Sequence, residues 1–400
     1  MTVWGRFDPE ENPVVSTGQK IGQGEGDPRE PVAAPLSNAQ ALGIRQVIDQ
    51  DGKPTGNLPD PGLSKDECLM FYRVMALLRA IDQRGWTLQR SGRIAFWIPI
   101  CGQEAVQVGA THAMDREDWI FRAHREMAPW IMRGEPLDLM FAQFFGAEAE
   151  PQRGRRLPCL IGSRKIKLVS SSTQVGAYIP HGAGAGWAAK LMGSDEVVLS
   201  FFGDGATSRG EFHSAMNFAG IHKPQVVFVC VNNGWAVTTP LDRQTAQENF
   251  AAKGAAYGLP NLRVDGNDPL AVYAVVKEAR DRAKAEGPTL IEAITYRLGF
   301  HTSSDNPDLY RKKDECDDWA RWDPIVRMRR YLEHAGWWTE ADEAELAERQ
   351  AAEIQDAVER AEKMPVPGPT SQFDDLYEDS NWMLEEQKAR LLRDLAGDGA

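Results

Sequence analysis

The sequence predicts an α/β fold, with a mostly parallel sheet covered by helices on both faces. Two short apolar runs, 197–202 and 226–231, are rich in β-branched and aromatic residues, as buried strands of parallel sheets are. Residues 207–221 lie between these runs and have the length and apolar spacing of a crossover helix. A third strand-like run, 289–296, follows a helical stretch over 269–286. Strands that alternate with helices in this way indicate a sheet built from β-α-β units.

The first 63 residues are predicted to form an extended N-terminal arm. Residues 1–63 are rich in proline, glycine and charge, and they show no sustained hydrophobic period. A small hairpin is expected around 45–49, with its turn at Asp51 and Gly52. We expect the arm to lie on the surface of a partner, and disorder is the alternative.

The α/β domain is predicted to span residues 64–335. Its first helix begins at Ser64, where acidic residues follow in the first turn, and it runs towards Gln89. Further helices are expected to open at 102–105 and to cover 137–145.

The last part of the chain, residues 336–400, is predicted to be a helical C-terminal region. Residues 339–364 are charged and helical in pattern, and 373–395 form a final amphipathic stretch. We expect this region to pack on the α/β domain or on a partner subunit.

Composition and charge exclude several classes of protein. The 400 residues are 42% hydrophobic and 26% charged, which is ordinary for a globular chain. With 45 basic and 58 acidic residues the net charge is −13, so we expect no nucleic-acid partner and no membrane binding. The five cysteines are scattered without a CxxC pair, and no apolar run approaches the roughly eighteen residues of a transmembrane helix. The chain also begins without a basic-then-apolar signal, so a cytoplasmic location is expected.

Two short polar motifs mark the ends of the first two predicted strands. Gly203-Asp204-Gly205 follows one apolar run, and Asn232-Asn233 follows the other. Neighbouring parallel strands end at the same edge of a sheet, where open α/β folds bind ligands. One carboxylate and one amide oxygen brought together there suit Mg²⁺, which completes its shell with phosphate oxygens and water. The flanking glycines allow the backbone to approach a diphosphate, and the pair of motifs resembles the thiamine-diphosphate-binding motif.

Each of these motifs alone is more often a simple turn than a ligand site. We assign a function to the pair because both motifs stand in register on one β-α-β unit. An NAD-dependent Rossmann enzyme is disfavoured, since no GxGxxG follows a strand. The small-residue run 182–186 has its third glycine one residue too early for that fingerprint, and it is interpreted as close packing of a helix.

Several other stretches carry a resemblance to a known family, namely 92–97, 102–105, 124–126, 264–268 and 296–311. From about residue 64 to its end, the chain resembles the α subunit of the thiamine-diphosphate-dependent decarboxylase component of 2-oxo acid dehydrogenase complexes. Within that family, residues 93–97 and 301–305 favour the branched-chain type over the pyruvate type. The alternatives are a pyruvate or acetoin dehydrogenase α subunit and, more remotely, a non-catalytic cofactor-binding scaffold.

The resemblance implies a bound thiamine diphosphate with Mg²⁺. Asp204 and Asn233 would hold Mg²⁺ through their side chains, and Trp235 through its backbone carbonyl. Arg125 would bind the diphosphate, because a guanidinium group matches phosphate oxygens and stays charged. The full set of cofactor-binding residues that the resemblance implies is His124, Arg125, Thr173, Val175, Gly203, Asp204, Gly205, Ala206, Asn233, Arg297 and His301.

His301 is the candidate catalytic residue. A lone histidine in a loop is more often a surface residue, but the resemblance implies that His301 reaches the diphosphate and assists acyl transfer to an incoming lipoyl group. Arg297, Asp305, Tyr310 and Arg311 would order its loop through charge-assisted bonds.

Three further positions bear on the substrate and the cofactor. The resemblance implies that Phe96 and Val175 line a pocket for the acyl group. His124 stands where branched-chain relatives often carry tyrosine. A neutral histidine packed at a helix edge is therefore the alternative to a contact between His124 and the diphosphate.

The resemblance also implies partner subunits. The decarboxylation needs a glutamate against the aminopyrimidine ring of the cofactor, and no residue of this chain is assigned to that position. The chain holds one α/β domain, whereas thiamine sites in this superfamily lie between two. Both observations predict an α₂β₂ heterotetramer in which a β subunit supplies the glutamate. A small 2-oxo acid is the expected substrate, and a lipoyl acyltransferase core is the expected acceptor of the acyl group.

Overall fold

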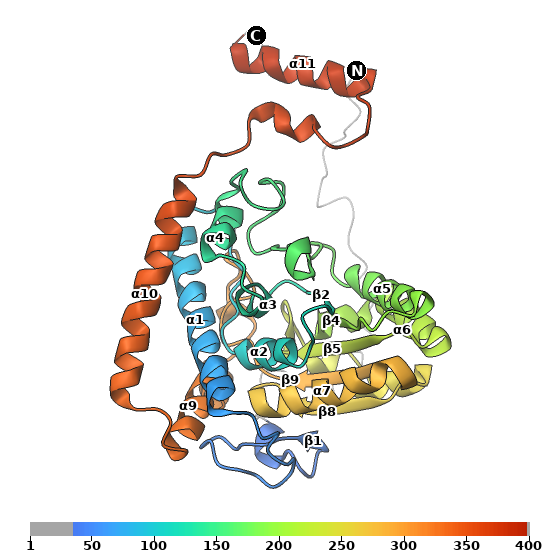
Figure 1. Ribbon diagram of the computed structural model, residues 1–400, viewed down its shortest axis with the longest axis vertical. Helices are drawn as coiled ribbons and strands as arrows, with labels where there is room; N and C mark the ends of the chain where they lie inside the picture. The colour runs from blue at the N-terminus through green and yellow to red at the C-terminus, as the bar shows by residue number, and fades with distance from the viewer. Residues whose placement is uncertain (1–34, 398–400) are drawn as a thin grey trace, which may run out of the picture.

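Residues 35–397 are described by the computed structural model of this chain, which is built around a seven-stranded sheet (Figure 1). The strands follow the order β1-β8-β9-β5-β4-β2-β3, and neighbouring strands in this part of the chain are parallel. The α/β class predicted from the sequence is therefore confirmed. The strands are β1 (Ile44–Arg45), β2 (Trp119–Phe121), β3 (Leu168–Val169), β4 (Val198–Gly203), β5 (Val226–Asn232), β8 (Asn261–Asp265) and β9 (Thr289–Ile294). A separate antiparallel pair follows β5 and consists of β6 (Trp235–Ala236) and β7 (Thr239–Pro240).

Helices cover both faces of the sheet (Figure 1). α5 and α6 pack together on one face, and α2 and α7 pack together on the other. The chain moves towards β1 in the sheet when it passes from β4 to β5 through α6, and away from β1 when it passes from β8 to β9 through α7. Because β-α-β crossovers are right-handed, these two helices lie on opposite faces of the sheet. The helices are α1 (Lys65–Arg90), α2 (Glu104–His112), α3 (Ala128–Met132), α4 (Leu137–Phe145), α5 (Tyr178–Met192), α6 (Gly210–His222), α7 (Pro269–Glu286), α8 (Lys313–Ala320), α9 (Pro324–His334), α10 (Glu340–Glu362) and α11 (Trp382–Ala396).

The two strands that carry the polar motifs are direct neighbours. β4 and β5 pair in parallel, and Gly203 at the end of β4 is the partner of Val231 near the end of β5. The helix between them begins later than the sequence predicted, because Asp204–Ser208 forms a 3₁₀ turn before α6 starts at Gly210. Both motifs therefore reach the same edge of the sheet.

Two glycines of the 182–186 run allow α5 to approach its neighbours closely. A Cβ atom at Gly182 would lie 3.1 Å from the Cβ of Ser200 on β4. A Cβ atom at Gly186 would lie 2.8 Å from the backbone oxygen of Gln225. Since the interior has no spare volume, a larger residue at either position would push the helix away. The interpretation of this run as close packing is confirmed.

The described part of the predicted N-terminal arm, residues 35–63, packs on the sheet of its own chain. Ile44–Arg45 pairs with β8 as an edge strand. The backbone N–H groups of Val47 and Ile48 both donate to the carboxylate of Asp268, at 2.7 and 2.8 Å. Asp268 also caps the first turn of α7, so one buried carboxylate joins the arm to that helix. The expected hairpin is present in short form, with an antiparallel bridge between Ile48 and Pro54 and backbone bonds from Asp49 to Lys53 and from Thr55 to Val47. Residues 1–34 lie outside the described part of the chain.

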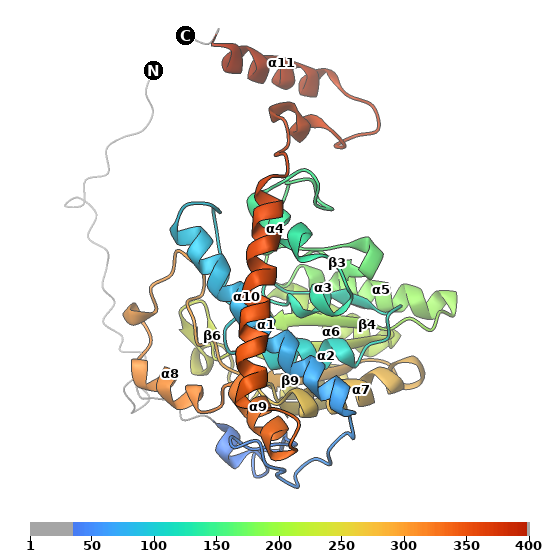
Figure 2. The same cartoon turned by 60° about the vertical axis from the view of Figure 1, so that its left-hand side comes forward.

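The C-terminal region divides into a packed helix and a detached one. α10 lies along α1 and α4, where an ion pair joins Arg360 to Asp138 at 3.0 Å (Figure 2). α11 stands away from the α/β body in both views and has no buried residue (Figures 1 and 2). It contacts mainly the short 3₁₀ segment Pro369–Phe373 that precedes it. The division of the chain at residues 63 and 335 stays a prediction.

Within residues 35–397, no helix is both long and apolar enough to span a membrane. The five cysteines are free thiols. Burial raises the pKa of Cys68 and of Cys159 to about 12, so both thiols stay protonated at neutral pH.

Candidate active site

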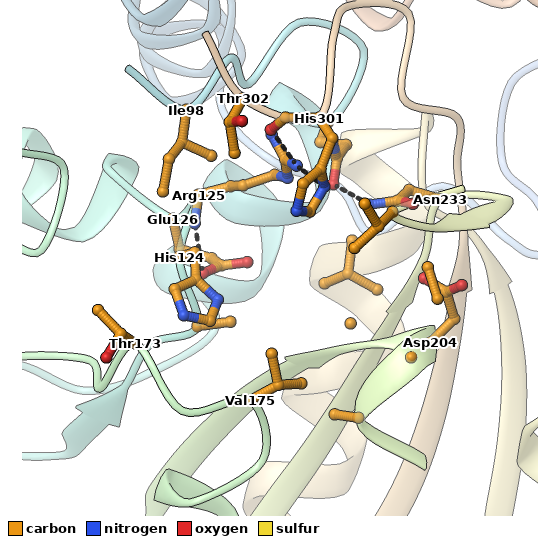
Figure 3. A pocket seen from close by; sticks show the side chains of 18 of the residues that line it. Ile98, His124, Arg125, Glu126, Thr173, Val175, Asp204, Asn233, His301 and Thr302 are labelled. Carbon is orange, nitrogen blue, oxygen red and sulfur yellow. Dashed lines mark hydrogen bonds between the residues drawn. The ribbon is translucent and has the colours of Figure 1, made fainter. Parts of the chain in front are cut away.

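A cavity of about 500 Å³ opens at the carboxyl ends of β4 and β5. Figure 3 looks into this cavity. Arg297 does not line it but lies in contact with His301, a residue that does. The other residues that the sequence analysis assigned to the cofactor, the metal or the acyl group all line the cavity: Phe96, His124, Arg125, Thr173, Val175, Gly203, Asp204, Gly205, Ala206, Asn233, Trp235 and His301.

The lining has two chemically different parts. We call the first the polar lining, and Figure 3 shows its members on one side and across the top of the cavity: Arg125, Asp204, Asn233 and His301. The second is the apolar lining, which consists of Phe96, Ile98, Leu157, Leu160 and Val175. Only Phe96 and Val175 of the apolar lining were predicted from the sequence.

Asp204 and Asn233 form the corner of the polar lining that suits a cation. Both side chains are buried, with exposed fractions of 2% and 7%. Asp204 accepts a hydrogen bond on Oδ2 from Gln244 Nε2 at 2.6 Å, and Asn233 Nδ2 donates to Gln103 Oε1 at 3.1 Å. Burial raises the pKa of Asp204, and the hydrogen bond from Gln244 opposes that shift. Burying a carboxylate without a compensating positive charge costs free energy, so the environment of Asp204 favours a cation beside it.

The backbone carbonyl of Trp235 was predicted to be the third metal ligand. In the structure it accepts a hydrogen bond from Arg297 Nη1 at 3.3 Å. A carbonyl oxygen has two lone pairs, so one of them is left for another partner. The indole N–H of Trp235 donates to Glu315 at 3.0 Å and fixes the residue in place. The role of this carbonyl as a metal ligand stays a prediction.

Arg125 and His301 form the basic part of the polar lining. Arg125 donates from Nη2 to the backbone oxygen of His301 at 2.9 Å, and its Nη1 donates to the backbone oxygen of Pro99. Burial and the neighbouring charge of Arg297 lower the pKa of Arg125 to about 10, which leaves it charged at neutral pH. A buried guanidinium group that meets mainly backbone oxygens retains charge for an anionic ligand.

The ring of His301 is neutral in this arrangement. Its Nδ1 accepts from Arg125 Nη2 at 3.1 Å and from Arg297 Nη1 at 3.2 Å, so the ring proton resides on Nε2. Burial and the two guanidinium groups lower the pKa of His301 to about 3. An anion bound beside Arg125 would offset these positive charges and raise the pKa again.

The loop that carries His301 is held by the residues expected from the sequence. Asp305 Oδ2 accepts from the backbone N–H of His301 at 2.7 Å and from the hydroxyl of Tyr310 at 2.6 Å. Tyr310 in turn accepts from Arg297 Nη2 at 2.7 Å. Arg311 donates to the backbone oxygens of residues 297–299. The expectation that these four side chains order the loop is confirmed.

His124 lines the cavity and bonds to the backbone at the same time. Its Nε2 donates to the backbone oxygen of Ser172 at 2.8 Å. Burial and the charge of Arg122 lower the pKa of His124 to about 4, so the ring is neutral at physiological pH. The ring of His124 thus lies in a loop segment after β2 and faces the cavity, and its contact with the diphosphate stays a prediction.

Several polar residues of the site were not predicted from the sequence. Gln103 and Gln244 hold the two side chains of the cation corner. Glu126 is a buried part of the lining, where it accepts from the backbone N–H of Arg125 at 3.3 Å. Burial raises the pKa of Glu126, and the charge of Arg122 opposes the shift. Gln103 lies in the 102–105 turn, so its motif was visible in the sequence although its contact was not.

The described residues fit a diphosphate and a hard cation. Three buried atoms near the cavity have no hydrogen-bond partner, namely Gln103 Nε2, Gln244 Oε1 and Arg297 Nε. The described part of the chain contains no cluster of three His, Cys, Asp or Glu side chains able to hold a metal. A metal in this corner would thus take carboxylate, amide and carbonyl oxygens, which is typical of Mg²⁺ and unlike zinc.

The parallel sheet and the cavity at its carboxyl edge define an α/β protein with a ligand site at the strand ends. The chain belongs to the dehydrogenase E1 component family, whose sequence profile matches residues 72–370. It is similar to the 2-oxoisovalerate dehydrogenase subunit alpha of Bacillus subtilis (strain 168), with 40% identity over 319 residues, 79% of this chain and 97% of that protein. The mitochondrial protein of the same name from Mus musculus is 39% identical over 354 residues, 88% of this chain and 80% of the relative. Subunit alpha 1 from Arabidopsis thaliana is 35% identical over 359 residues, 89% of this chain and 76% of the relative.

Proposed function

We propose that this chain is the α subunit of a branched-chain 2-oxo acid dehydrogenase that decarboxylates acids such as 3-methyl-2-oxobutanoate. One observation carries the proposal: Asp204 and Asn233 share a single cavity with Arg125 and His301. The similarity to proteins named 2-oxoisovalerate dehydrogenase subunit alpha in a bacterium, an animal and a plant supports the substrate class.

Thiamine diphosphate with Mg²⁺ is the cofactor that we propose for the cavity. When bound, it supplies the electron sink that decarboxylation of a 2-oxo acid requires. Asp204 and Asn233 would hold Mg²⁺ through side-chain oxygens, and the Trp235 carbonyl would be a third ligand. Arg125 would bind the diphosphate through its charged guanidinium group.

His301 would hold and move a proton at Nε2. Its Nδ1 is occupied by Arg125 and Arg297, so the proton of the neutral ring resides on Nε2. Because an anionic diphosphate offsets the two guanidinium charges, the pKa of His301 would rise towards neutrality when the cofactor is present. A histidine in that range is suited to general acid and base chemistry during acyl transfer.

The apolar lining would contact the acyl side chain. Ile98 and Leu160 are buried, and the half-exposed Val175 lies across the cavity from Ile98 (Figure 3). An aliphatic lining removes water from a branched side chain and offers it more contact than it offers a methyl group. This favours branched-chain acids over pyruvate or acetoin, which remain the second candidates.

A β subunit would complete the site, and a lipoyl acyltransferase core would receive the acyl group. Within the described residues Glu126 is the glutamate of the lining, and the Arg125 backbone N–H already donates to its carboxylate. We therefore propose that the glutamate needed to activate the cofactor comes from a partner chain in an α₂β₂ assembly. The cytoplasmic location expected from the sequence stays a prediction, since the relatives include mitochondrial proteins.

The deciding experiment compares substrates on the assembled enzyme. The chain is co-purified with its β partner, and kcat/KM is measured for 3-methyl-2-oxobutanoate and for pyruvate. We expect a clear preference for the branched acid and no turnover by the chain alone. A strong preference for pyruvate would overturn the substrate class. Turnover without a partner would instead point to Glu126 as the activating carboxylate.

A further inference from the structure

We propose that Gln103 and Gln244 are positioning residues for the metal, one glutamine for each side-chain ligand. The inference rests on the proposed function, because it concerns the Mg²⁺ that would accompany the cofactor. The family resemblance assigned no role to either glutamine, although Gln103 lies in the 102–105 stretch that carries the resemblance. Each is identified by a hydrogen bond to a ligand and by an amide atom left without a partner.

Gln244 fixes Asp204 by donating to it. Its Nε2 donates to Asp204 Oδ2 at 2.6 Å and to the backbone oxygen of Thr239 at 3.0 Å. Both partners can only accept, so the nitrogen of this amide must face them. The bond from Gln244 fixes the orientation of the buried carboxylate, whose oxygens keep lone pairs for a cation.

Gln103 fixes Asn233 by accepting from it. The backbone N–H of Trp235 donates to Asn233 Oδ1 at 3.3 Å, which sets the orientation of the asparagine amide. The Nδ2 of Asn233 then faces Gln103 and donates to its Oε1 at 3.1 Å. One lone pair of Asn233 Oδ1 remains, and the amide cannot flip without losing both hydrogen bonds.

The backbone holds Gln103 in this position. Gly102 adopts φ +94°, and a Cβ atom there would lie 2.3 Å from the backbone oxygen of Tyr296. The hydroxyl of Thr295 donates to the backbone oxygen of Gly102 at 2.7 Å and ties the turn to the segment after β9. Gln103 is also the N-cap residue of α2, yet its side chain makes no capping bond. Its side-chain oxygen accepts from Asn233 and does not cap the helix.

The unpartnered amide atoms point to the same site. Gln103 is 1% exposed, and its Nε2 is a buried donor in the lining of the cavity. Gln244 Oε1 is a buried acceptor beside Asp204. A buried donor without a partner suits a phosphate oxygen, and a buried acceptor suits a water on the metal. Residues that hydrogen-bond to metal ligands hold those ligands in orientation, and losing one such residue typically weakens metal binding about 10–100-fold.

The test measures Mg²⁺-dependent binding of thiamine diphosphate to the α₂β₂ assembly, by calorimetry or tryptophan fluorescence, without reference to turnover. Gln103→Met and Gln244→Met keep the size of each side chain and remove its amide. We expect each to raise the Mg²⁺ concentration for half-saturation about 10–100-fold. Gln225→Met is the matched control, because Gln225 is a buried glutamine whose amide donates to the backbone of residues 194 and 196, away from the cavity.

Glutamate substitutions separate hydrogen bonding from packing. Gln103→Glu keeps the acceptor for Asn233 but loses the Nε2 donor, so it should lose less Mg²⁺ affinity than Gln103→Met. Gln244→Glu replaces a donor by a carboxylate that faces Asp204, so it should lose at least as much as Gln244→Met. If the two glutamines only filled space, the glutamate variants at positions 103 and 244 would change the Mg²⁺ concentration for half-saturation by the same factor.

Three results would overturn the inference. One is half-saturation by Mg²⁺ within twofold of the wild type in both methionine variants. Another is an equal loss in Gln225→Met, and the third is an equal response to glutamate at positions 103 and 244. If the wild-type assembly itself fails to bind thiamine diphosphate with Mg²⁺, the proposed function fails and this inference fails with it.

Discussion

The polar lining and the apolar lining of the cavity are held in place by different means. Each side chain of the polar lining is fixed by hydrogen bonds, such as those from Gln244 to Asp204 and from Arg125 to His301. The apolar lining is placed only by packing, and Val175 and Leu157 are 43% and 50% exposed. The polar lining is thus fixed in one geometry, whereas the apolar lining can change at little cost to the fold.

The largest effect is expected from Asp204→Ala, which breaks the polar lining at its cation corner. It should weaken Mg²⁺-dependent binding of thiamine diphosphate in the assembled protein on the order of 100-fold or more. Calorimetry measures the affinity. Asp281→Ala on the exposed surface of α7 is the control for removing a carboxylate. Wild-type affinity in Asp204→Ala would place the metal elsewhere.

His301→Ala tests whether the polar lining also serves proton transfer. Transfer of the acyl group to a lipoyl domain should fall about 10²–10⁴-fold, since that is the usual contribution of a general acid or base. Decarboxylation with an artificial electron acceptor should fall less. His334→Ala, at the exposed end of α9, is the matched control. Equal losses in both assays would show that His301 has no specific role in transfer.

Val175→Phe tests whether the apolar lining contacts the acyl side chain of the substrate. The larger ring would fill space in the cavity, so kcat/KM for 3-methyl-2-oxobutanoate should fall about tenfold relative to that for pyruvate. The affinity for thiamine diphosphate should stay near the wild-type value. Val366→Phe is the control, because Val366 is exposed and lies outside the cavity. An unchanged ratio between the two substrates would remove Val175 from the acyl pocket.

The smallest effect concerns the pH dependence of stability. The pKa of His301 is about 3 in the folded protein, below the 6.5 of a free imidazole. The unfolded chain therefore takes up a proton first, and the free energy of unfolding falls as pH drops from about 6.5 towards 3. His301→Gln should remove part of this slope in the cofactor-free protein, on the order of 1–3 kcal/mol. Urea unfolding at pH 7 and pH 4 measures it, and an unchanged slope would contradict the buried, neutral ring.

The polar lining was largely predictable, because its key residues follow strands that the sequence marks clearly. Asp204 and Asn233 stand at fixed positions after two apolar runs, and parallel pairing brings the ends of such strands together. Gln244 gave no such signal, since it follows a short 3₁₀ turn and reaches Asp204 only through tertiary structure. Ile98, Leu157 and Leu160 lie in irregular segments, where no hydrophobic period indicates which way a side chain points.

The detached helix α11 has a practical consequence for anyone who prepares the chain by itself. Its apolar residues Trp382, Met383, Leu392 and Leu395 are all about half exposed or more. The connecting residues 374–380 are largely open to water as well, and exposed connections are the preferred sites of protease cleavage. Limited proteolysis should therefore trim α11 from the isolated chain and leave the α/β body whole. Slower trimming after addition of the β partner would make this cleavage a simple gel assay for assembly.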